Sequence, residues 1–508
     1  MHHIDRVGLP PHSATMIQCL AFGEGYVDYF DEGTVELATC GISEATNAVI
    51  APGPQESRGD LPAQVVDFAW FFEDVASPDT FADRIYRSLQ RTLRAFPEAE
   101  GRCVRTPESW QIKCCNHGVP FSRVLNFGLD LEQQRHKPAA GHLFDRVDGD
   151  RVLGGDEPLL RVKLTLFGAR GYCLALSASR ALCDAHGLLA LFTRAWSSNE
   201  RAAICPAPSH DRDCVPLSRA APHDDVRRLV ETLVPPPASI YGTLARSFFF
   251  GAPAPKVETL LRLSFSQADV ERLKRDTVGG AVPKVSTNDV LVAHAAHLVA
   301  LLLEGGIPGR DAGDALHCYC ALDLRKYADD PRLANRAFCN AVASLRLASM
   351  PLPSGAAAAK ALARDLRTTV ESLSPDAARH LRAAYDRLPP GSAVQGPAMV
   401  CTNWLKLPAN EVGFNGETAA SYGLGLSYWR DAAEMMAKTA ATRNVVAVCA
   451  FSRNCEDASG ASIYADILLP TGGKDDSAIK VHSLADNARL HPLLRLKLAA
   501  GPAFIDVS

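Results

Sequence analysis

The chain has 508 residues, of which 53 are Lys or Arg and 57 are Asp or Glu, and its formal net charge is −4. At roughly 100–200 residues per domain, this length predicts two to four domains with an ample core. The near-neutral charge offers no basic surface for nucleic acid, so we expect no nucleic-acid partner. The 15 cysteines include no Cys-x-x-Cys pair, which argues against a zinc site and a disulfide framework. No apolar run has the length of a signal peptide or a membrane span, which predicts a cytoplasmic protein without membrane contact.

The first part of the chain alternates between strand and helix patterns. A helix is expected between Phe81 and Phe96, where apolar residues recur at helical spacing. Another is expected over 183–196, joined by a short loop to the strand before it. Runs of apolar and β-branched residues predict strands at 64–72, 110–115, 159–166 and 172–177.

The pattern is lost between 202 and 254, where prolines cluster, and this predicts a crossover between two halves. Beyond it, Ser286-Thr-Asn-Asp289 has the pattern of a capping box that opens an apolar helix. A last helical stretch is expected at 483–499. Further strands are predicted at 261–265, 316–322, 399–404, 445–451 and 462–469.

Strands that alternate with helices indicate an α/β chain. We expect an N-terminal domain over 1–204, a crossover linker over 205–254 and a C-terminal domain over 255–508.

Eight segments follow one another along the chain: LQRTLRAFPEAEGRC, LLRVKLTLF, LSASRALCDAHGLLALFTRAW, KVSTNDVLVAHAAHLV, CALDLRKYADDPRLANRAFCNAV, VCTNWLKLP, SYGLGLSYW and DILLPTGG. In this order they resemble segments of the BAHD acyltransferase family. The resemblance implies two chloramphenicol-acetyltransferase-like domains, each a mixed sheet flanked by helices, in a monomer with an active-site channel between them. It also implies that acyl-CoA enters the channel as co-substrate from one face, and a small acceptor alcohol or amine from the other. No permanently bound cofactor and no metal are expected.

The family's His-x-x-x-Asp-Gly motif falls on Arg180-Ala-Leu-Cys-Asp184-Ala185. In the family the histidine takes the proton from the acceptor, whereas here Arg180 occupies its position. A guanidinium has a pKa above about 12 and cannot accept a proton near neutral pH. General-base assistance supplies ~10²–10⁴-fold, or roughly 3–5 kcal/mol of barrier. A chain with Arg180 is therefore expected to be slow, rearranged or engaged in another task.

Other family positions are retained unevenly. Thr402 and Trp404 match a segment in which a hydroxyl and an indole N–H face the developing oxyanion. Ser286 and Thr287 resemble part of the CoA-side wall. Asp184 in the family pairs with an arginine, for which Arg325 is the candidate. The family's Asp-Phe-Gly-Trp-Gly signature appears as Ser421-Tyr-Gly423-Leu-Gly425, which keeps both glycines and loses the aspartate.

Another residue could replace the missing base. His186, at the expected start of a helix, is the catalytic candidate, although a histidine there more often caps the helix or faces solvent. His294 and His297 are expected to be core residues and His117 a turn residue. Cys183 would serve as a nucleophile only with an activating neighbour.

Arg180 itself has two interpretations. It is either a fixed cation that binds a carboxylate, phosphate or enolate, or the partner of Asp184 or another acid that plugs the channel. Acyl transfer from CoA to an alcohol or amine is the first functional hypothesis. The alternatives are a CoA-independent catalyst of cyclisation or condensation that uses Arg180, and a ligand-binding pseudoenzyme.

Overall fold

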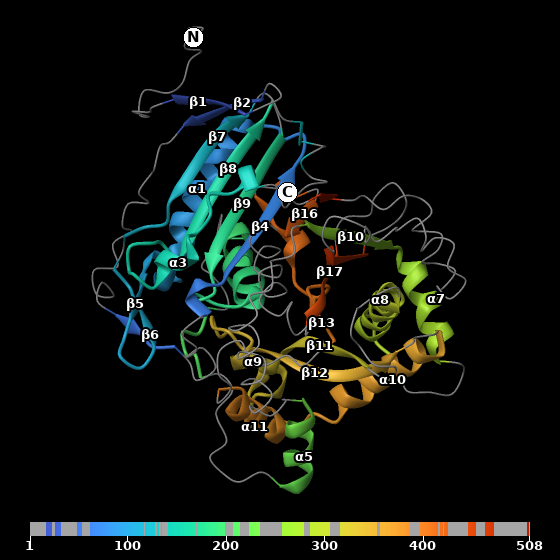
Figure 1. The fold of residues 1–508 in the computed structure, drawn as a ribbon. Helices are drawn as coiled ribbons and strands as arrows, with labels where there is room; N and C mark the ends of the chain where they lie inside the picture. The colour runs from blue at the N-terminus through green and yellow to red at the C-terminus, as the bar shows by residue number, and fades with distance from the viewer. Residues whose placement is uncertain are drawn as a thin grey trace, which may run out of the picture.

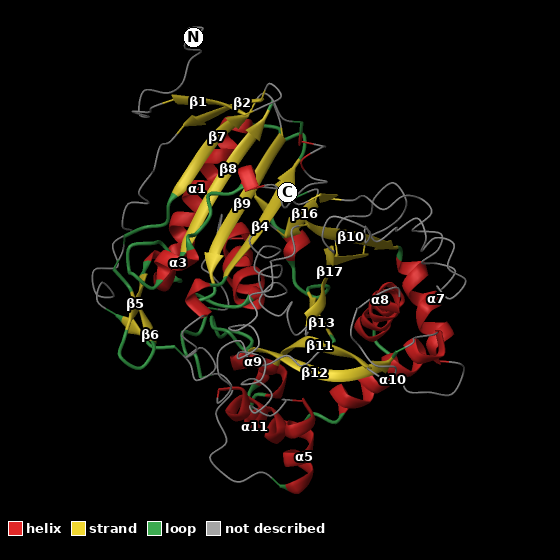
Figure 2. Cartoon of the chain, viewed as in Figure 1, coloured by secondary structure: helices red, strands yellow, loops and turns green. Residues whose placement is uncertain are grey.

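Two mixed sheets, each flanked by helices, carry most of the described chain in the computed structural model (Figures 1 and 2). The fold class predicted from the sequence is confirmed. The structure describes residues 17–22, 26–31, 48–52, 61–115, 117–126, 130–131, 134, 141–168, 171–198, 207–213, 223–233, 257–278, 285–304, 315–352, 356–386, 397–414, 417–419, 421–424, 445–453, 463–471 and 505–506.

The first sheet has seven strands in the described residues. Only β7 and β8 run parallel, and the other neighbours are antiparallel. Every residue of β4 and β9 is buried, as expected for central strands covered on both faces. In spatial order the strands are β1 (Ile17–Phe22), β2 (Tyr26–Asp31), β7 (Phe121–Asn126), β8 (Leu160–Phe167), β9 (Gly171–Ser179), β4 (Val65–Phe72) and β16 (Ser421–Leu424).

The second sheet also has seven strands in the part of the chain that is described. β13 runs parallel to both of its neighbours, and the other pairs are antiparallel. In spatial order the strands are β12 (Val342–Pro351), β11 (Ala315–Asp323), β13 (Ala398–Asn403), β17 (Val445–Arg453), β18 (Ile463–Thr471), β10 (Val257–Phe265) and β19 (Ile505–Asp506).

The smaller sheets and the helices complete the two halves. The small sheets join β3 (Val49–Ile50), β6 (Trp110–Lys113) and β5 (Arg102–Arg105), and β14 (Gly413–Phe414) with β15 (Glu417–Thr418). The α-helices are α1 (Pro78–Leu93), α3 (Gly149–Val152), α4 (Arg194–Ser198), α5 (Asp224–Leu233), α7 (Gln267–Val278), α8 (Thr287–Glu304), α9 (Pro331–Ala334), α10 (Ala356–Glu371) and α11 (Pro375–Asp386). Single turns of 3₁₀ helix lie at Leu61–Ala63, Pro97–Glu100, Gly141–Leu143, Leu324–Tyr327 and Ala409–Glu411.

Two large apolar clusters form the cores. One joins β4, β8 and β9 to α1, and its members include Phe68, Trp70 and Ile85. The other packs α8 and α10 against the second sheet. α8 is apolar on nearly all sides because it lies between that sheet and other helices, and its first turn has the capping box predicted from the sequence. There, Asp289 Oδ2 accepts the Ser286 backbone N–H at 2.7 Å, and Ser286 Oγ accepts the Asp289 N–H at 3.3 Å.

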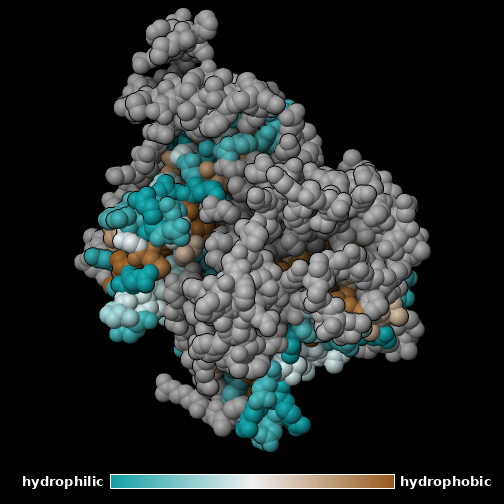
Figure 3. Space-filling view, in the orientation of Figure 1, coloured by the Kyte–Doolittle hydropathy of each residue, from teal (hydrophilic) through white to brown (hydrophobic). Residues whose placement is uncertain are grey.

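Two sequence expectations need correction. The expected loss of regular structure over 202–254 is wrong in part, because α5 is an amphipathic helix inside this range. Its outer surface is hydrophilic in the space-filling view (Figure 3), and Leu233 is buried at its end. The helix expected over 183–196 begins with a turn of π-helix, Gly187–Thr193. The short β16, from the C-terminal half of the sequence, pairs with β4 of the first sheet. The domain boundaries at 204 and 255 stay predictions. The expected helix at 483–499 lies outside the described residues.

Candidate active site

The loop that follows β9 carries the motif that includes Arg180 and Asp184. β9 ends at Ser179, and the loop turns into the π-helix at Gly187. The start of this helix comes so close to the loop that a Cβ on Gly187 would lie 2.6 Å from Cys183 Cβ. Only glycine fits there without a shift of the backbone. The loop is therefore closely packed against its own helix.

Asp184 anchors this loop to the second half of the chain. Its two carboxylate oxygens receive the Arg325 Nη1–H at 2.8 Å and the Nη2–H at 3.2 Å. They also accept the backbone N–H groups of Gly187 at 3.0 Å and Ala341 at 2.8 Å. Both side chains of the ion pair are buried, at 3% exposure for Asp184 and 0% for Arg325. The pairing that the sequence suggested is thus present as a bidentate bridge between the halves.

Arg325 is in turn held by groups around the start of β12. Its Nη2 donates to the carbonyl of Cys339 at 2.6 Å, and its Nη1 lies 3.3 Å from Asp323 Oδ1. Burial raises the pKa of Asp184, but the Arg325 charge and hydrogen bonds outweigh burial and lower it below its usual value. An ionised carboxylate with this many donors is a poor base. The role that fits Asp184 is to fix the loop.

Arg180 lies between the two halves and does not pair with Asp184. Its Nη1 donates to Gln64 Oε1 at 3.0 Å, and its Nη2 lies 3.5 Å from Asn340 Oδ1. Its backbone is fixed by the same two residues: the Arg180 N–H donates to the Gln64 carbonyl at 2.8 Å, and Asn340 Nδ2 donates to the Arg180 carbonyl at 2.8 Å. The interpretation of Arg180 as the partner of Asp184 is wrong, because Arg325 already binds both oxygens of that carboxylate.

The substitute bases occupy different environments. His186 immediately precedes the π-helix, and its Nε2 lies 3.0 Å from the carbonyl of Asn335, without a cap to the helix. Burial raises the pKa of Cys183 well above its usual value, which makes it a poor nucleophile. His294 and His297 are buried on α8, as expected of core residues.

Thr402 and Trp404 form a chain of hydrogen-bond donors at the end of β13. The Trp404 Nε1–H donates to Thr402 Oγ1 at 2.9 Å, which leaves the Thr402 hydroxyl hydrogen to donate onward. Donors in series polarise one another, so this hydroxyl is a stronger donor than an isolated threonine. Trp404 is held by its ring contact with Phe68 of β4, with 5.1 Å between centroids. The pair thus joins the second sheet to the first.

The start of α8 lies beside this donor pair. Asn403, between Thr402 and Trp404 in the sequence, donates a hydrogen bond to the side chain of Asn288. The two CoA-side candidates, Ser286 and Thr287, directly precede Asn288 and are partly exposed. The structure therefore places the expected CoA wall and the expected oxyanion donors at one place.

The degenerate second signature is only partly described. Ser421 and Gly423 lie on β16, opposite Phe71 and Ala69 of β4. Gly425 lies outside the described residues. The signature therefore forms the last strand of the first sheet.

Comparison with solved structures identifies the fold. No protein-family model and no curated protein matches the chain. Vinorine synthase is similar at a TM-score of 0.54 and 18% identity, over 83% of this chain and 92% of that one. TRI101 of F. sporotrichioides, complexed with coenzyme A and T-2, is similar at 0.61 and 16%, over 87% and 97%. TRI101 of F. graminearum, with coenzyme A and deoxynivalenol, is similar at 0.61 and 14%, over 87% and 98%.

The chain has a BAHD-like fold. The resemblance stated from the sequence is confirmed at this level, since both named proteins are BAHD acyltransferases. The BAHD-like fold does not by itself assign an activity to Arg180 or to any other residue of the motif.

Residues 207–213, expected to be part of the linker, are bonded to the motif loop of this BAHD-like fold. The buried Arg212 guanidinium donates to the carbonyls of Ala181 at 2.9 Å and Leu182 at 2.8 Å. Ser209 exchanges backbone hydrogen bonds with Arg336 and Phe338 on the other half. We call residues 207–213 the strap. Sequence reasoning missed it, because prolines around it indicated irregular chain and nothing indicated its contacts.

His210 of the strap binds Glu98, a fully buried carboxylate, through Nδ1 at 2.8 Å. This hydrogen bond raises the pKa of His210, while partial burial and the nearby Arg212 oppose the rise. A raised histidine pKa stabilises the fold below pH ~6.5, and the contribution is lost as the pH rises through the folded-state value.

We therefore expect the denaturant concentration at the midpoint of unfolding to decrease as the pH is raised from 6 to 8. In His210→Asn this part of the decrease is expected to be absent. The asparagine keeps a donor for Glu98 that does not titrate. The effect is on the order of 0.5 kcal/mol, because the imidazole is 40% exposed and screened by solvent. Denaturant unfolding at several pH values measures it. Equal pH slopes in the two proteins would show that His210 does not contribute.

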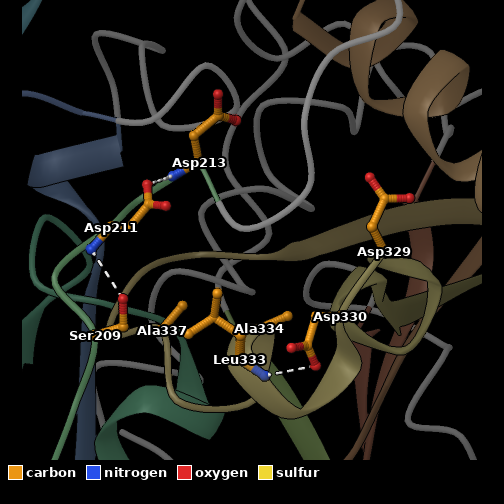
Figure 4. A pocket seen from close by; sticks show the side chains of 8 residues that line it. All are labelled: Ser209, Asp211, Asp213, Asp329, Asp330, Leu333, Ala334 and Ala337. Carbon is orange, nitrogen blue, oxygen red and sulfur yellow. Dashed lines mark hydrogen bonds between the residues drawn. The ribbon is translucent and has the colours of Figure 1, made fainter.

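A surface hollow lies where the strap meets α9 (Figure 4). Two of its carboxylates already have partners in the protein. Asp330 accepts the N–H groups of Arg332 and Leu333, and Asp329 pairs with Arg379. Within the described ranges, no group of three or more His, Cys, Asp or Glu side chains has the arrangement of a metal site. The hollow is lined by Ser209, Asp211, Asp213, Asp329, Asp330, Leu333, Ala334 and Ala337.

None of the helices in the described part of the chain is both long and apolar enough to span a membrane.

Proposed function

We propose that the chain transfers an acyl group from a CoA thioester to an amine or alcohol of a small acceptor, without a histidine base. The observation that carries this proposal is the donor chain from Trp404 Nε1 through the Thr402 hydroxyl, beside the start of α8. A fixed donor aimed at developing negative charge is often the largest single catalytic contribution. The coenzyme A in the TRI101 structures supports a CoA thioester as the donor.

The step proceeds by attack of the acceptor's nitrogen or oxygen on the thioester carbonyl carbon. The carbonyl oxygen becomes an oxyanion, which the Thr402 hydroxyl stabilises. The carbon–sulfur bond then breaks, the electron pair leaves with the CoA sulfur, and the proton lost by the acceptor goes to that sulfur through solvent. An amine that arrives unprotonated needs the least help, so amines are the favoured acceptors.

The other motif residues position the reaction. Asp184 and Arg325 fix the loop, and Arg180 supplies a permanent positive charge where the family has its base. Ser286 and Thr287 form the wall against which CoA lies. We place this reaction in a monomer, because one chain carries both sheets and the candidate site residues. The compartment that we propose is the cytoplasm, as expected from the sequence.

Titration with CoA and a panel of short acyl-CoA thioesters, followed by calorimetry and by melting shift, tests the donor. A ligand that binds only the native state raises its stability by RT ln(1 + [L]/Kd). Binding of thioesters supports acyl transfer. Absence of binding by every thioester would contradict it and favour the CoA-independent alternative, in which Arg180 acts on a substrate without CoA.

Arg180→His restores the family's base and is expected to raise the rate of transfer to alcohols about 10²-fold or more. The reason is that an imidazole accepts the proton that a guanidinium cannot. Release of CoA thiol measures the rate, with Arg180→Gln as the matched control that has no base. If neither protein turns over any thioester that binds, the chain is a ligand-binding pseudoenzyme.

A further inference from the structure

Arg180 is positioned by both halves of the chain. Gln64 immediately precedes β4, and Ser179 lies opposite Val65 in the register of β4 and β9, so the backbones of Gln64 and Arg180 meet. Asn340 precedes β12 of the second sheet. The Arg180 side chain is partly exposed, and amide oxygens hold it from either side. Its direction is thus set before any ligand arrives.

The charge of Arg180 is not matched by a carboxylate of the described residues. Its two side-chain partners are the neutral oxygens Gln64 Oε1 and Asn340 Oδ1. The buried Arg325 differs, because it pairs with the Asp184 carboxylate at 2.8 Å. Charges taken out of water are normally paired, so a half-buried cation between neutral partners is arranged for an anion that comes from outside.

A guanidinium has five N–H donors in a planar fork, and the two amide contacts use only two of them. The remaining donors match the geometry of a carboxylate, which arginine binds through two parallel hydrogen bonds. We infer that Arg180 binds a carboxylate of the small-molecule substrate beside the reacting thioester. This inference rests on the proposed acyl transfer, because it makes Arg180 a specificity residue of that site.

The carboxylate has two possible sources, the acyl group or the acceptor, and two matched pairs of probes separate them. Glutaryl-CoA and pentanoyl-CoA differ by one carboxylate on the acyl chain. Phenylalanine and phenylalaninamide, titrated in the presence of CoA, differ by one on the acceptor. In one of the two pairs, calorimetry on the full chain is expected to show that the compound with the carboxylate binds at least about tenfold more tightly than the compound without it. A hydrogen bond to a charged group contributes that much.

Two variants identify Arg180 as the cause. Arg180→Gln is expected to reduce the preference to less than twofold, because the charge is gone. Gln64→Glu keeps Arg180 and places a carboxylate on the atom that Nη1 contacts, so it is expected to remove the preference as well. Arg123→Gln, which breaks an exposed pair with Asp83, is the control that leaves the preference unchanged.

A preference that is absent from both pairs, or that survives in Arg180→Gln, overturns the inference. The failure of the proposed function is a different result: neither thioester binds, whatever its charge. Inorganic phosphate is included as a competitor. If phosphate binds and none of the carboxylate probes displaces it, the inference is also overturned, because the ligand of Arg180 is then a phosphate.

Discussion

Asp184→Asn is expected to lower the free energy of unfolding by about 3–5 kcal/mol, the usual cost of breaking a buried ion pair from one side. The asparagine is nearly the same size and can still accept one backbone N–H. It cannot balance the Arg325 charge, which has no exposure to solvent. Most of the loss therefore comes from the cation that remains buried.

Denaturant unfolding at pH 7 measures this loss, and Asp323→Asn is the matched control. Asp323 contacts the same Nη1 at 3.3 Å, but its side chain is 25% exposed, so its replacement is expected to cost far less. Equal losses in the two variants would mean that the bridge to Asp184 has no special role. The pKa of Asp184 is lowered, so the stabilisation is complete above pH ~4 and disappears only as the pH falls through the folded-state value.

Thr402→Val is expected to reduce kcat for acyl transfer about 10²–10³-fold, with little change in thioester binding. Valine has the shape of threonine but no hydroxyl. The missing donor matters only when negative charge develops on the thioester oxygen, so the substitution lowers the rate and not the binding of the thioester. Thr402→Ser keeps a hydroxyl for Trp404 Nε1 and is expected to retain most of the rate.

Single-turnover release of CoA, together with calorimetry for binding, separates the two effects. Thr402→Val also leaves the buried indole N–H without its acceptor, at a cost of about 1–3 kcal/mol in stability. Activity is therefore measured well below the melting temperature of the variant. If Thr402→Val retains the wild-type kcat, the donor chain is not the oxyanion site.

Local patterns account for what could be predicted from the sequence. Strong β runs gave the central strands, and the spacing of Ser286 and Asp289 gave the first turn of α8, because both depend on neighbours within a few residues. Such runs predicted β4, β8 and β9 of the first sheet and β10, β11, β13, β17 and β18 of the second, but not β1, β2 or β7. The order of the segments predicted the fold. The strand β12 was missed, and so was α5, whose amphipathic pattern lies among prolines.

The surroundings of Arg180 could not be predicted in the same way. Gln64 and Asn340 lie 116 and 160 residues from it, and although Asn340 lies in one of the eight segments, nothing in that segment indicates a contact with Arg180. Their meeting depends on the register of β4 with β9 and on the packing of one half against the other. The π-helix was equally inaccessible, since its apolar residues recur much as in an α-helix and only the backbone hydrogen bonds differ.

The pairing of β16 with β4 joins a segment from the C-terminal half of the sequence to the first sheet. A fragment that ends before residue 421 would leave the backbone of β4 unpaired along one edge, although all eight of its side chains are buried. Open, apolar strand edges recruit other chains and lead to aggregates. During synthesis this edge of β4 therefore closes only after roughly 210 further residues have been added beyond the strap.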